Sequence, residues 1–300
     1  MFPIMSKNMR RVYVTPDGTR IVSGDHDGGV KVWDMATGEE VCFFRKHRYA
    51  AECICVSPDG TRVISGSCLF GLYQGGFGRI GEVLVWDVNT GENIHVLRGH
   101  TQNLSSVCVT PDGTRIVSAS EDNTVKVWDM ETGEELRTLN GHTNTALSIC
   151  VTPDGTRIVS GSGDNTVKVW DMETGEELRT LTGHTDWVHS VCVTPDGTRI
   201  VTGSFDHTIK VWDMATGEEL RTLTGHKGWV WSVCVTPDGT RIVSGSDDNT
   251  VKVWDMATGE ELRTLTGHTR LLNCVCVTSD NMRLVTASRN EIIVWDFDDM

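Results

Sequence analysis

The segment GHTDWVHSVCVTPDGTRIVTGSFDHTIKVWDMATGEELRTLT, residues 183–224, decides the fold because the chain repeats it with small changes. The frame starts again at residue 225 as GHKGWVWSVCVTPDG, and the two copies share their ends but differ in their middles. A Trp-Asp pair recurs at Trp33, Trp86, Trp128, Trp170, Trp212, Trp254 and Trp295, with gaps of 53, 42, 42, 42, 42 and 41 residues. A period of this length indicates an array of small units that pack on one another.

Each copy is typical of four short strands. The stretches RIVSGS and TVKVWD are rich in β-branched residues, as strands are. TPDGT places proline at the second and glycine at the fourth position of a type I turn, and ATGEE supplies a glycine able to adopt positive φ in the next hairpin. We therefore expect strand a (SVCVT), strand b, strand c ending at Trp-Asp, and strand d (ELRTL), and no long amphipathic helix.

The Trp-Asp pairs and the Gly-His pairs beginning at Gly99, Gly141, Gly183, Gly225 and Gly267 resemble the WD-repeat (WD40) β-propeller family. The resemblance covers almost the whole chain. It implies an all-β, seven-bladed β-propeller with four-stranded antiparallel blades around a central channel. One domain, 1–300, would then hold blades at approximately 6–45, 46–98, 99–140, 141–182, 183–224, 225–266 and 267–300, the last completed by residues 1–5.

The ring has to close, yet the chain ends at VWDFDDM without a strand d for blade 7. The family usually takes this strand from the N-terminus. Counting back from VYVTPDG, only Met1 and Phe2 reach the strand d region, and Met5 aligns with the histidine of the Gly-His pairs. We expect a short N-terminal strand that pairs with the last blade, and we favour a chain that is a piece of something longer.

Composition narrows the class of protein. The net charge of −14 argues against a nucleic-acid binder, which needs a basic stripe. No run of about 18 apolar residues predicts a membrane span, and the start MFPIMSKNMRR lacks a stretch of signal-peptide length. Cysteines recur in VCV triplets, which predicts small core residues in a reducing cytoplasm. We expect no cofactor, and no metal at the pairs Cys53/Cys55 and Cys274/Cys276, because the pairs lie in different blades.

The constant frame contains a histidine, a hydroxyl, an aspartate and a tryptophan in each of four copies. A Ser-His-Asp set invites a hydrolase hypothesis, but its recurrence favours a structural role. In the family these residues form a hydrogen-bonded chain inside each blade. The resemblance assigns to this network His100, Ser118, Asp122, Trp128, His142, Ser160, Asp164, Trp170, His184, Thr202, Asp206, Trp212, His226, Ser244, Asp248 and Trp254.

Three blades depart from the frame. Blade 1 has Ser23, Asp27 and Trp33 without the histidine, and blade 2 has His47 but an insertion in place of the aspartate loop. In blade 7 the loop is one residue shorter, with Asn290 near the aspartate position. Blades 7, 1 and 2 adjoin around the ring, so we predict that they form its less stable arc.

The differences between copies concentrate after Gly-His, in the d–a loop, and before the network aspartate, in the b–c loop. In a propeller both loops emerge on one face, called the top face below. Three of the ten tryptophans lie outside Trp-Asp pairs, all in this region, and exposed aromatic clusters anchor protein interfaces. The predicted partner-binding residues are Trp187, His189, Phe205, Trp229, Trp231, Asp247, Asp186, Leu271, Asn273, Arg289, Arg10 and His26, with Asn8, Glu52, Asn103, Ser105, Glu121, Thr145 and Leu147 as further candidates.

Blade 2 carries an insertion of about eleven residues within Cys68–Glu82. It adds Phe70, Tyr73 and Phe77 to the predicted top-face residues, for contact with a partner or as a cap on the channel. GFGRIG within it matches the dinucleotide fingerprint, which needs a following helix, whereas strand c of a blade follows here. We expect a flexible glycine-rich loop.

The leading functional hypothesis is a non-catalytic module or scaffold that binds a protein or peptide through its top face, centred on blades 5 and 6 and the blade 2 insertion. The near-copy repeats resemble the sensor propellers of some NTPase-linked receptors. We expect a monomer, or part of a longer chain or complex, without nucleic-acid or membrane binding. The alternatives are a consensus-like or engineered repeat without a ligand, and an enzyme using His189 with Asp247.

Overall fold

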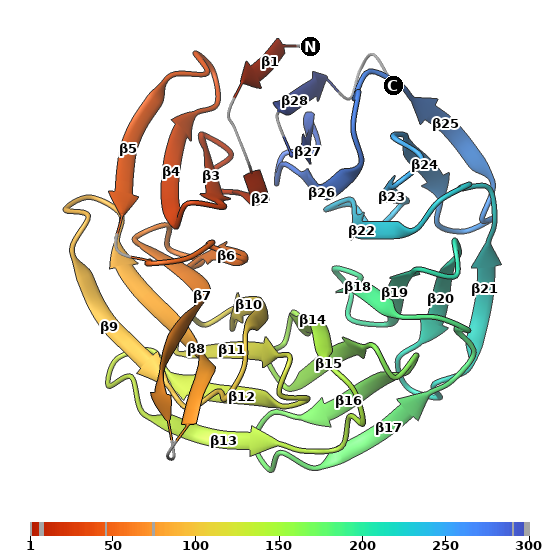
Figure 1. Cartoon of the computed structure of the whole chain (residues 1–300). Helices are drawn as coiled ribbons and strands as arrows, with labels where there is room; N and C mark the ends of the chain where they lie inside the picture. The colour runs from red at the N-terminus through yellow and green to blue at the C-terminus, as the bar shows by residue number, and fades with distance from the viewer. Residues whose placement is uncertain (1, 6–8, 46, 74–75, 290, 297–300) are drawn as a thin grey trace.

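The computed structural model describes residues 2–5, 9–45, 47–73, 76–289 and 291–296, and side chains from residue 11 onward apart from 45–46, 70–78, 290 and 297–300. The chain forms seven four-stranded antiparallel sheets arranged as a ring around a central opening (Figure 1). The described residues contain no helix, and therefore no helix that is long and apolar enough to cross a membrane. The expected seven-bladed, all-β propeller is confirmed.

Strands follow one another from the centre of each blade outward. The innermost strands, a, are β2 (Met9–Val14), β6 (Cys53–Val56), β10 (Leu104–Val109), β14 (Ala146–Val151), β18 (Val188–Val193), β22 (Val230–Val235) and β26 (Leu272–Val277). Strands b are β3 (Arg20–Asp25), β7 (Arg62–Tyr73), β11 (Arg115–Ser120), β15 (Arg157–Ser162), β19 (Arg199–Ser204), β23 (Arg241–Ser246) and β27 (Arg283–Ser288). Strands c are β4 (Gly29–Asp34), β8 (Gly76–Asp87), β12 (Val125–Asp129), β16 (Val167–Asp171), β20 (Ile209–Asp213), β24 (Val251–Asp255) and β28 (Glu291–Asp296). The outermost strands, d, are β5 (Glu40–Arg45), β9 (Asn93–Arg98), β13 (Glu135–Leu139), β17 (Glu177–Leu181), β21 (Glu219–Leu223), β25 (Glu261–Leu265) and β1 (Phe2–Met5).

The N-terminal strand β1 supplies strand d of blade 7. It runs antiparallel to β28, with Phe2 opposite Val294 and Met5 opposite Glu291. The strand is longer than Met1 and Phe2 alone, so that expectation was wrong in extent. Met5 belongs to this strand and not to a histidine position of blade 1, because the connection from β1 to β2 is shorter than in the other blades.

The hydrophobic core lies between neighbouring blades. Between blades 4 and 5, for example, Val159, Val169 and Leu181 of one sheet pack against Ile200 and Trp212 of the next, all nearly inaccessible to solvent. An equivalent cluster fills each of the other junctions. Each blade therefore buries its two apolar faces only when both neighbours are present, as expected for a repeat protein.

The turns follow the sequence signals. In blade 5 the amide of Gly197 donates to the carbonyl of Thr194 at 2.8 Å and closes the TPDG turn. Gly197 has φ +72°, a conformation that a side chain disfavours. Asp196 reinforces the turn by accepting from Thr194 Oγ1 and from the amide of Thr198.

The blade 2 insertion is a β-hairpin and not the flexible loop expected from its glycines. Strands β7 and β8 remain paired from Arg62 opposite Asp87 out to Tyr73 opposite Gly76. In the view of Figure 1 the hairpin extends across blade 3, and the amide of Gly81 donates to the carbonyl of His100. A Cβ on Gly81 would lie 2.2 Å from Leu104 Cδ2, so this glycine serves close packing on blade 3.

Several cysteines of the innermost strands line a second cavity. Cys55, Cys108, Cys150 and Cys276 lie with Tyr13 around a cavity of about 530 Å³. Burial raises the pKa of each of these thiols, to about 12 for Cys276. All ten cysteines are free thiols.

Candidate functional site

Four blades contain the complete hydrogen-bonded chain that the sequence predicts. In blade 5, Trp212 Nε1 donates to Thr202 Oγ1 at 3.0 Å, Thr202 Oγ1 lies 2.7 Å from His184 Nε2, and His184 Nδ1 lies 2.7 Å from Asp206 Oδ2. A carboxylate accepts, so Nδ1 donates to it and Nε2 accepts from the hydroxyl. Blades 3, 4 and 6 repeat the chain through His100, Ser118, Asp122 and Trp128; His142, Ser160, Asp164 and Trp170; and His226, Ser244, Asp248 and Trp254.

The network aspartate also holds the loops together. Asp206 accepts from the amides of Thr185 and Thr208 as well as from His184. Burial raises the pKa of this carboxyl, but the hydrogen bonds from His184 and Thr208 outweigh it and hold the pKa well below its usual range. Asp206 therefore stays ionised, with its oxygens committed to the scaffold. A hydrolytic role would require the imidazole and the hydroxyl to be released from this structure.

The three remaining blades have incomplete or altered networks. In blade 7, Glu291 replaces the aspartate and accepts from His268 Nδ1 at a longer 3.2 Å. The predicted position, Asn290, lies outside the described residues. In blade 2, His47 Nε2 contacts Ser65 Oγ at 2.6 Å, but its buried Nδ1 has no partner among the described residues. Blade 1 keeps the bond from Trp33 to Ser23, and Asp25 accepts the amides of Asp27 and Gly29 in its turn.

A second network, missed by the sequence analysis, ties strand c to strand d. In blade 5 Lys210 Nζ lies 2.8 Å from Glu219 Oε2 and 2.7 Å from Thr222 Oγ1. Blades 3, 4 and 6 repeat it. The recurring Lys in VKVWD and Glu and Thr in EELRTL were the available signal. These residues are structural and leave the top-face loops as the candidate site.

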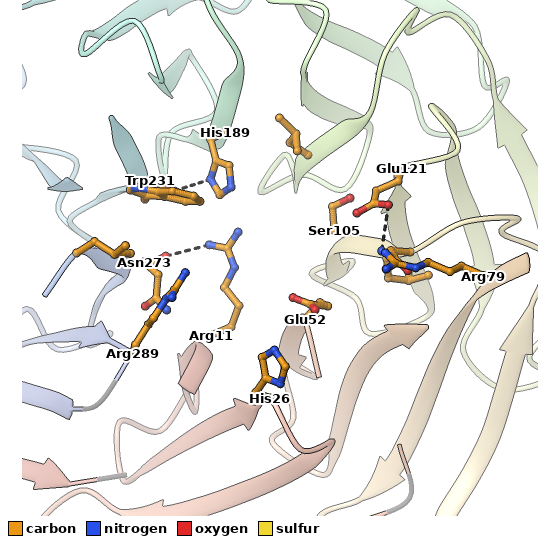
Figure 2. A pocket seen from close by; sticks show the side chains of 14 residues that line it. Arg11, His26, Glu52, Arg79, Ser105, Glu121, His189, Trp231, Asn273 and Arg289 are labelled. Atoms are coloured by element: carbon orange, nitrogen blue, oxygen red, sulfur yellow. Dashed lines mark hydrogen bonds between the residues drawn. The ribbon is translucent and has the colours of Figure 1, made fainter. Parts of the chain in front are cut away.

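The top-face site begins with a β-bulge in strand a. In six blades one residue of this strand has no partner in strand b, and in blade 5 it is His189, between Val188 opposite Ser204 and Ser190 opposite Gly203. A bulge re-aims its extra side chain. The bulge residues Ser105, Leu147, His189, Trp231 and Asn273 all line one cavity of about 740 Å³ at the mouth of the channel (Figure 2).

The charged residues that the structure describes in this cavity come from blades 7, 1, 2 and 3. Figure 2 shows Arg11 and Arg289 on the side of Trp231 and His189, with Glu52 and Glu121 on the other side. Arg11 donates to the carbonyl of Asn273 at 3.3 Å, and Asn103 Nδ2 donates to Glu121 Oε2 at 3.0 Å. His26, Arg79 and Leu271 complete the charged and apolar lining.

An aromatic ladder runs along the rim next to the cavity. Phe205 is sandwiched between Trp187, with ring centroids 5.9 Å apart, and Trp229, with centroids 4.6 Å apart. Trp187 and Trp229 are each 42% exposed, whereas Phe205 is only 9% exposed. The exposure expected for Phe205 was therefore wrong, because the two indoles cover its ring. His189 stacks on Phe205 and Trp231 packs edge-on against it, so the ladder, defined as Trp187, Phe205 and Trp229, continues into the cavity.

A hydrogen bond to the backbone fixes the tautomer of His189. Its Nδ1 lies 2.8 Å from the carbonyl oxygen of Trp231. A carbonyl can only accept, so Nδ1 carries the proton and Nε2 presents a lone pair. Burial above all, and then the positive charge of Arg11, lowers the pKa of His189 to about 3. The imidazole is neutral at physiological pH and offers an acceptor and an aromatic face.

The other predicted site residues fall into three groups. Asp247 is exposed on the rim, and Asp186 is half-buried with its carboxylate accepting the amide of Trp187. His26, Leu271, Asn273 and Arg289 line the cavity. The side chains of Arg10, Phe70, Tyr73 and Phe77 lie outside the described residues, as does the whole of Asn8.

Two charged cavity residues were missed, in addition to the buried Leu104. Arg11 occupies the strand a position that is serine in blades 3 to 6, where Ser190 Oγ, for example, accepts the amide of Val233 in the next blade. A long cation in a column of small residues was a usable signal. Arg79 comes from the blade 2 hairpin, and nothing in the repeat pattern could place it.

Comparisons with known proteins agree with this architecture. The profile described as "WDR3 first beta-propeller domain" matches residues 77–256, and "WD domain, G-beta repeat" matches residues 6–34, 38–68 and 259–296. Similar proteins include guanine nucleotide-binding protein subunit beta-5b of Danio rerio, 29% identical over 37% of this chain and 26% of its own length. Protein groucho of Drosophila melanogaster is 26% identical over 39% of this chain and 15% of its own length. The U3 small nucleolar RNA-associated protein 15 homolog of Xenopus tropicalis is 34% identical over 40% of this chain and 30% of its own length. The matches thus span less than a third of each of these relatives. With seven such blades and profile matches along most of its length, the chain belongs to the WD-repeat (WD40) β-propeller family.

Proposed function

We propose that this protein is a non-catalytic recognition module that binds a peptide segment of a partner protein through its top face. The observation that carries the proposal is the aromatic ladder, in which Trp187 and Trp229 expose 42% of their surface beside the channel-mouth cavity. Tryptophans in such positions are typical anchors of protein interfaces. Propellers of this family serve generally as interaction scaffolds.

An enzymatic function has weaker support. His189 Nδ1–H donates a hydrogen bond to the carbonyl oxygen of Trp231, and the low pKa of His189, about 3, makes it a poor proton acceptor at neutral pH. The recurring Ser-His-Asp sets are held inside their blades. We also propose a reducing, intracellular setting, which the ten free thiols support.

The test is selection of peptides from a random dodecapeptide display library on the immobilised protein. Selected peptides should bind Trp187→Ala/Trp229→Ala at least about 30-fold more weakly, as expected when hot-spot side chains worth about 2 kcal/mol are lost. The matched control is Leu178→Ala/Leu220→Ala, which removes two apolar side chains that are 44% and 45% exposed on strands β17 and β21.

The control variant should bind like the wild type, and all three proteins should have similar melting temperatures. Equal binding by the ladder variant would contradict the top-face proposal. Failure of the wild type to enrich any peptide would favour the alternative of a structural repeat without a ligand.

A further inference from the structure

The described side chains that line the channel-mouth cavity carry a net positive charge, in contrast to the chain as a whole. The protein as a whole carries −14. Among the side chains that the structure describes, the cavity is lined by three cations, Arg11, Arg79 and Arg289, and by two acids, Glu52 and Glu121, which leaves one excess positive charge in this described lining. A cationic patch attracts anionic groups, whereas the acidic remainder of the protein repels them.

The donors face the aromatic side of the cavity. Arg11 and Arg289 extend toward Trp231 and His189 (Figure 2). The indole Nε1–H of Trp231, a cavity-lining residue, is buried and has no hydrogen-bond partner among the described side chains. A buried donor without a partner costs stability that an incoming acceptor would recover. Arg11 and Arg289 line the same cavity, and guanidinium groups match the two oxygens of a carboxylate.

Resting on the proposed function, we propose that the cavity binds a single carboxylate of the partner peptide, between Arg11 and Arg289 and within reach of Trp231 Nε1. The aromatic ladder would hold an apolar side chain of the same peptide, because His189 and Trp231 connect the ladder to the cavity. One carboxylate balances the one excess positive charge. A phosphate dianion would leave a net negative charge beside Glu52 and Glu121, so the charge balance of the described lining favours the monoanion.

The test uses arrays of N-acetylated, C-amidated nonapeptides. One position is fixed as Glu, Gln, Lys or phosphoserine, and the others are mixtures of Gly, Ser, Leu and Trp. The blocked ends ensure that the fixed residue is the only source of anionic charge. An additional arm carries a free C-terminal carboxylate and no Glu, and so separates a side-chain from a terminal carboxylate as the source.

Wild-type protein should bind Glu peptides about ten-fold or more tightly than Gln peptides, because a Gln side chain cannot form the charge-assisted hydrogen bonds of a carboxylate. Arg11→Gln/Arg289→Gln should bind both at the Gln level. The single variant Arg289→Gln should show a preference for Glu over Gln peptides between that of the wild type and that of the double variant. Because Arg289 is exposed outside a strand, this variant tests the site even if replacement of Arg11 disturbs folding. The matched control Arg179→Gln/Arg221→Gln, on outer strands β17 and β21, should keep the wild-type preference.

Equal binding of Glu and Gln peptides by the wild type, together with no gain from a free C-terminal carboxylate, would overturn the inference. A carboxylate preference that survives in the Arg11→Gln/Arg289→Gln variant would also overturn it. Stronger binding of phosphoserine than Glu would overturn the assignment to a carboxylate. The proposed function fails separately, when Trp187→Ala/Trp229→Ala leaves binding of every peptide class unchanged. The two results are distinguishable because the ladder variant acts on Gln and Glu peptides alike.

Discussion

Blades 3 to 6, the regular arc, and blades 7, 1 and 2, the irregular arc, are built on the same frame but differ in their polar interior. Every regular blade has the full chain from tryptophan to aspartate. In the irregular arc, Glu291 replaces the aspartate in blade 7. Among the described residues, His47 lacks a partner at Nδ1, and blade 1 keeps only the Trp33–Ser23 bond of the chain. All seven sheets nevertheless form.

The difference separates what makes a blade from what stiffens it. Apolar clusters fill all seven junctions, and the bond from the Trp-Asp tryptophan to a Ser or Thr hydroxyl occurs in all seven blades. The histidine and the carboxylate are therefore dispensable for the fold. They add hydrogen bonds that fasten the d–a loop to the b–c loop, so their loss affects rigidity and stability.

The largest expected effect is from the network histidine. His184→Ala in blade 5 should lower the free energy of unfolding by about 3 kcal/mol, because it leaves Asp206 without its imidazole partner and opens a cavity. His47→Ala in blade 2 should cost only about 1 kcal/mol, since it removes one hydrogen bond and also a buried nitrogen without a partner. Denaturant unfolding measures both, and equal losses would refute the distinction between the arcs.

The next effect is a dependence on pH. Burial lowers the pKa of His47 to about 4 from its ordinary 6.5. A depressed folded-state pKa means that the unfolded chain takes up the proton first, so stability is complete above pH 6.5 and falls as the pH drops toward 4. Acidification from pH 6.5 to 5 should therefore lower the free energy of unfolding by about 2 kcal/mol through His47.

The control for this prediction is His47→Gln, which cannot titrate and should show a shallower loss of stability over the same range. His189, with its pKa lowered to about 3, contributes a loss of the same sign, so His189→Gln should also flatten the curve. A stability curve that rises on acidification from pH 6.5 to 5 would contradict the assignment.

The smallest effect compares the two kinds of carboxylate. Asp248→Asn in blade 6 should cost about 2 kcal/mol, because the carboxylate accepts from His226, Lys227 N and Thr250 at 2.6–3.0 Å. Glu291→Gln in blade 7 should cost less than about 1 kcal/mol, since its contacts with His268 and Thr269 N are 3.2 and 3.4 Å long. Thermal melting of the two variants gives the comparison, and a larger shift for Glu291→Gln would be inconsistent with it.

The sequence predicted most of the fold because the physical constraints recur every 42 residues. Repetition revealed the strands, the turns and the four complete networks. It failed where a segment occurs once: the blade 2 hairpin was expected to be a loop, since its glycines have no repeat counterpart. Gly81 is a contact residue with Leu104, which only the tertiary structure shows.

The candidate site was predicted in outline and corrected in detail. The variable loop positions identified Trp187, Trp229 and the cavity residues His189 and Trp231. Exposure was not predictable, because Phe205 is covered by indoles from two different blades. Arg79 reaches the cavity from a hairpin whose direction depends on packing against blade 3, so no local pattern contained it.

The β-bulge in strand a has a consequence for how such a surface can diversify. The bulge residue is not paired with any residue of strand b, so its identity can change without disturbing the strand pairing that holds the sheet together. Ser105, Leu147, His189, Trp231 and Asn273 occupy this one position in five blades that share the same strand a geometry. A ring of duplicated blades can thus acquire a new specificity one residue at a time, by ordinary point mutation, while the copies keep a common scaffold.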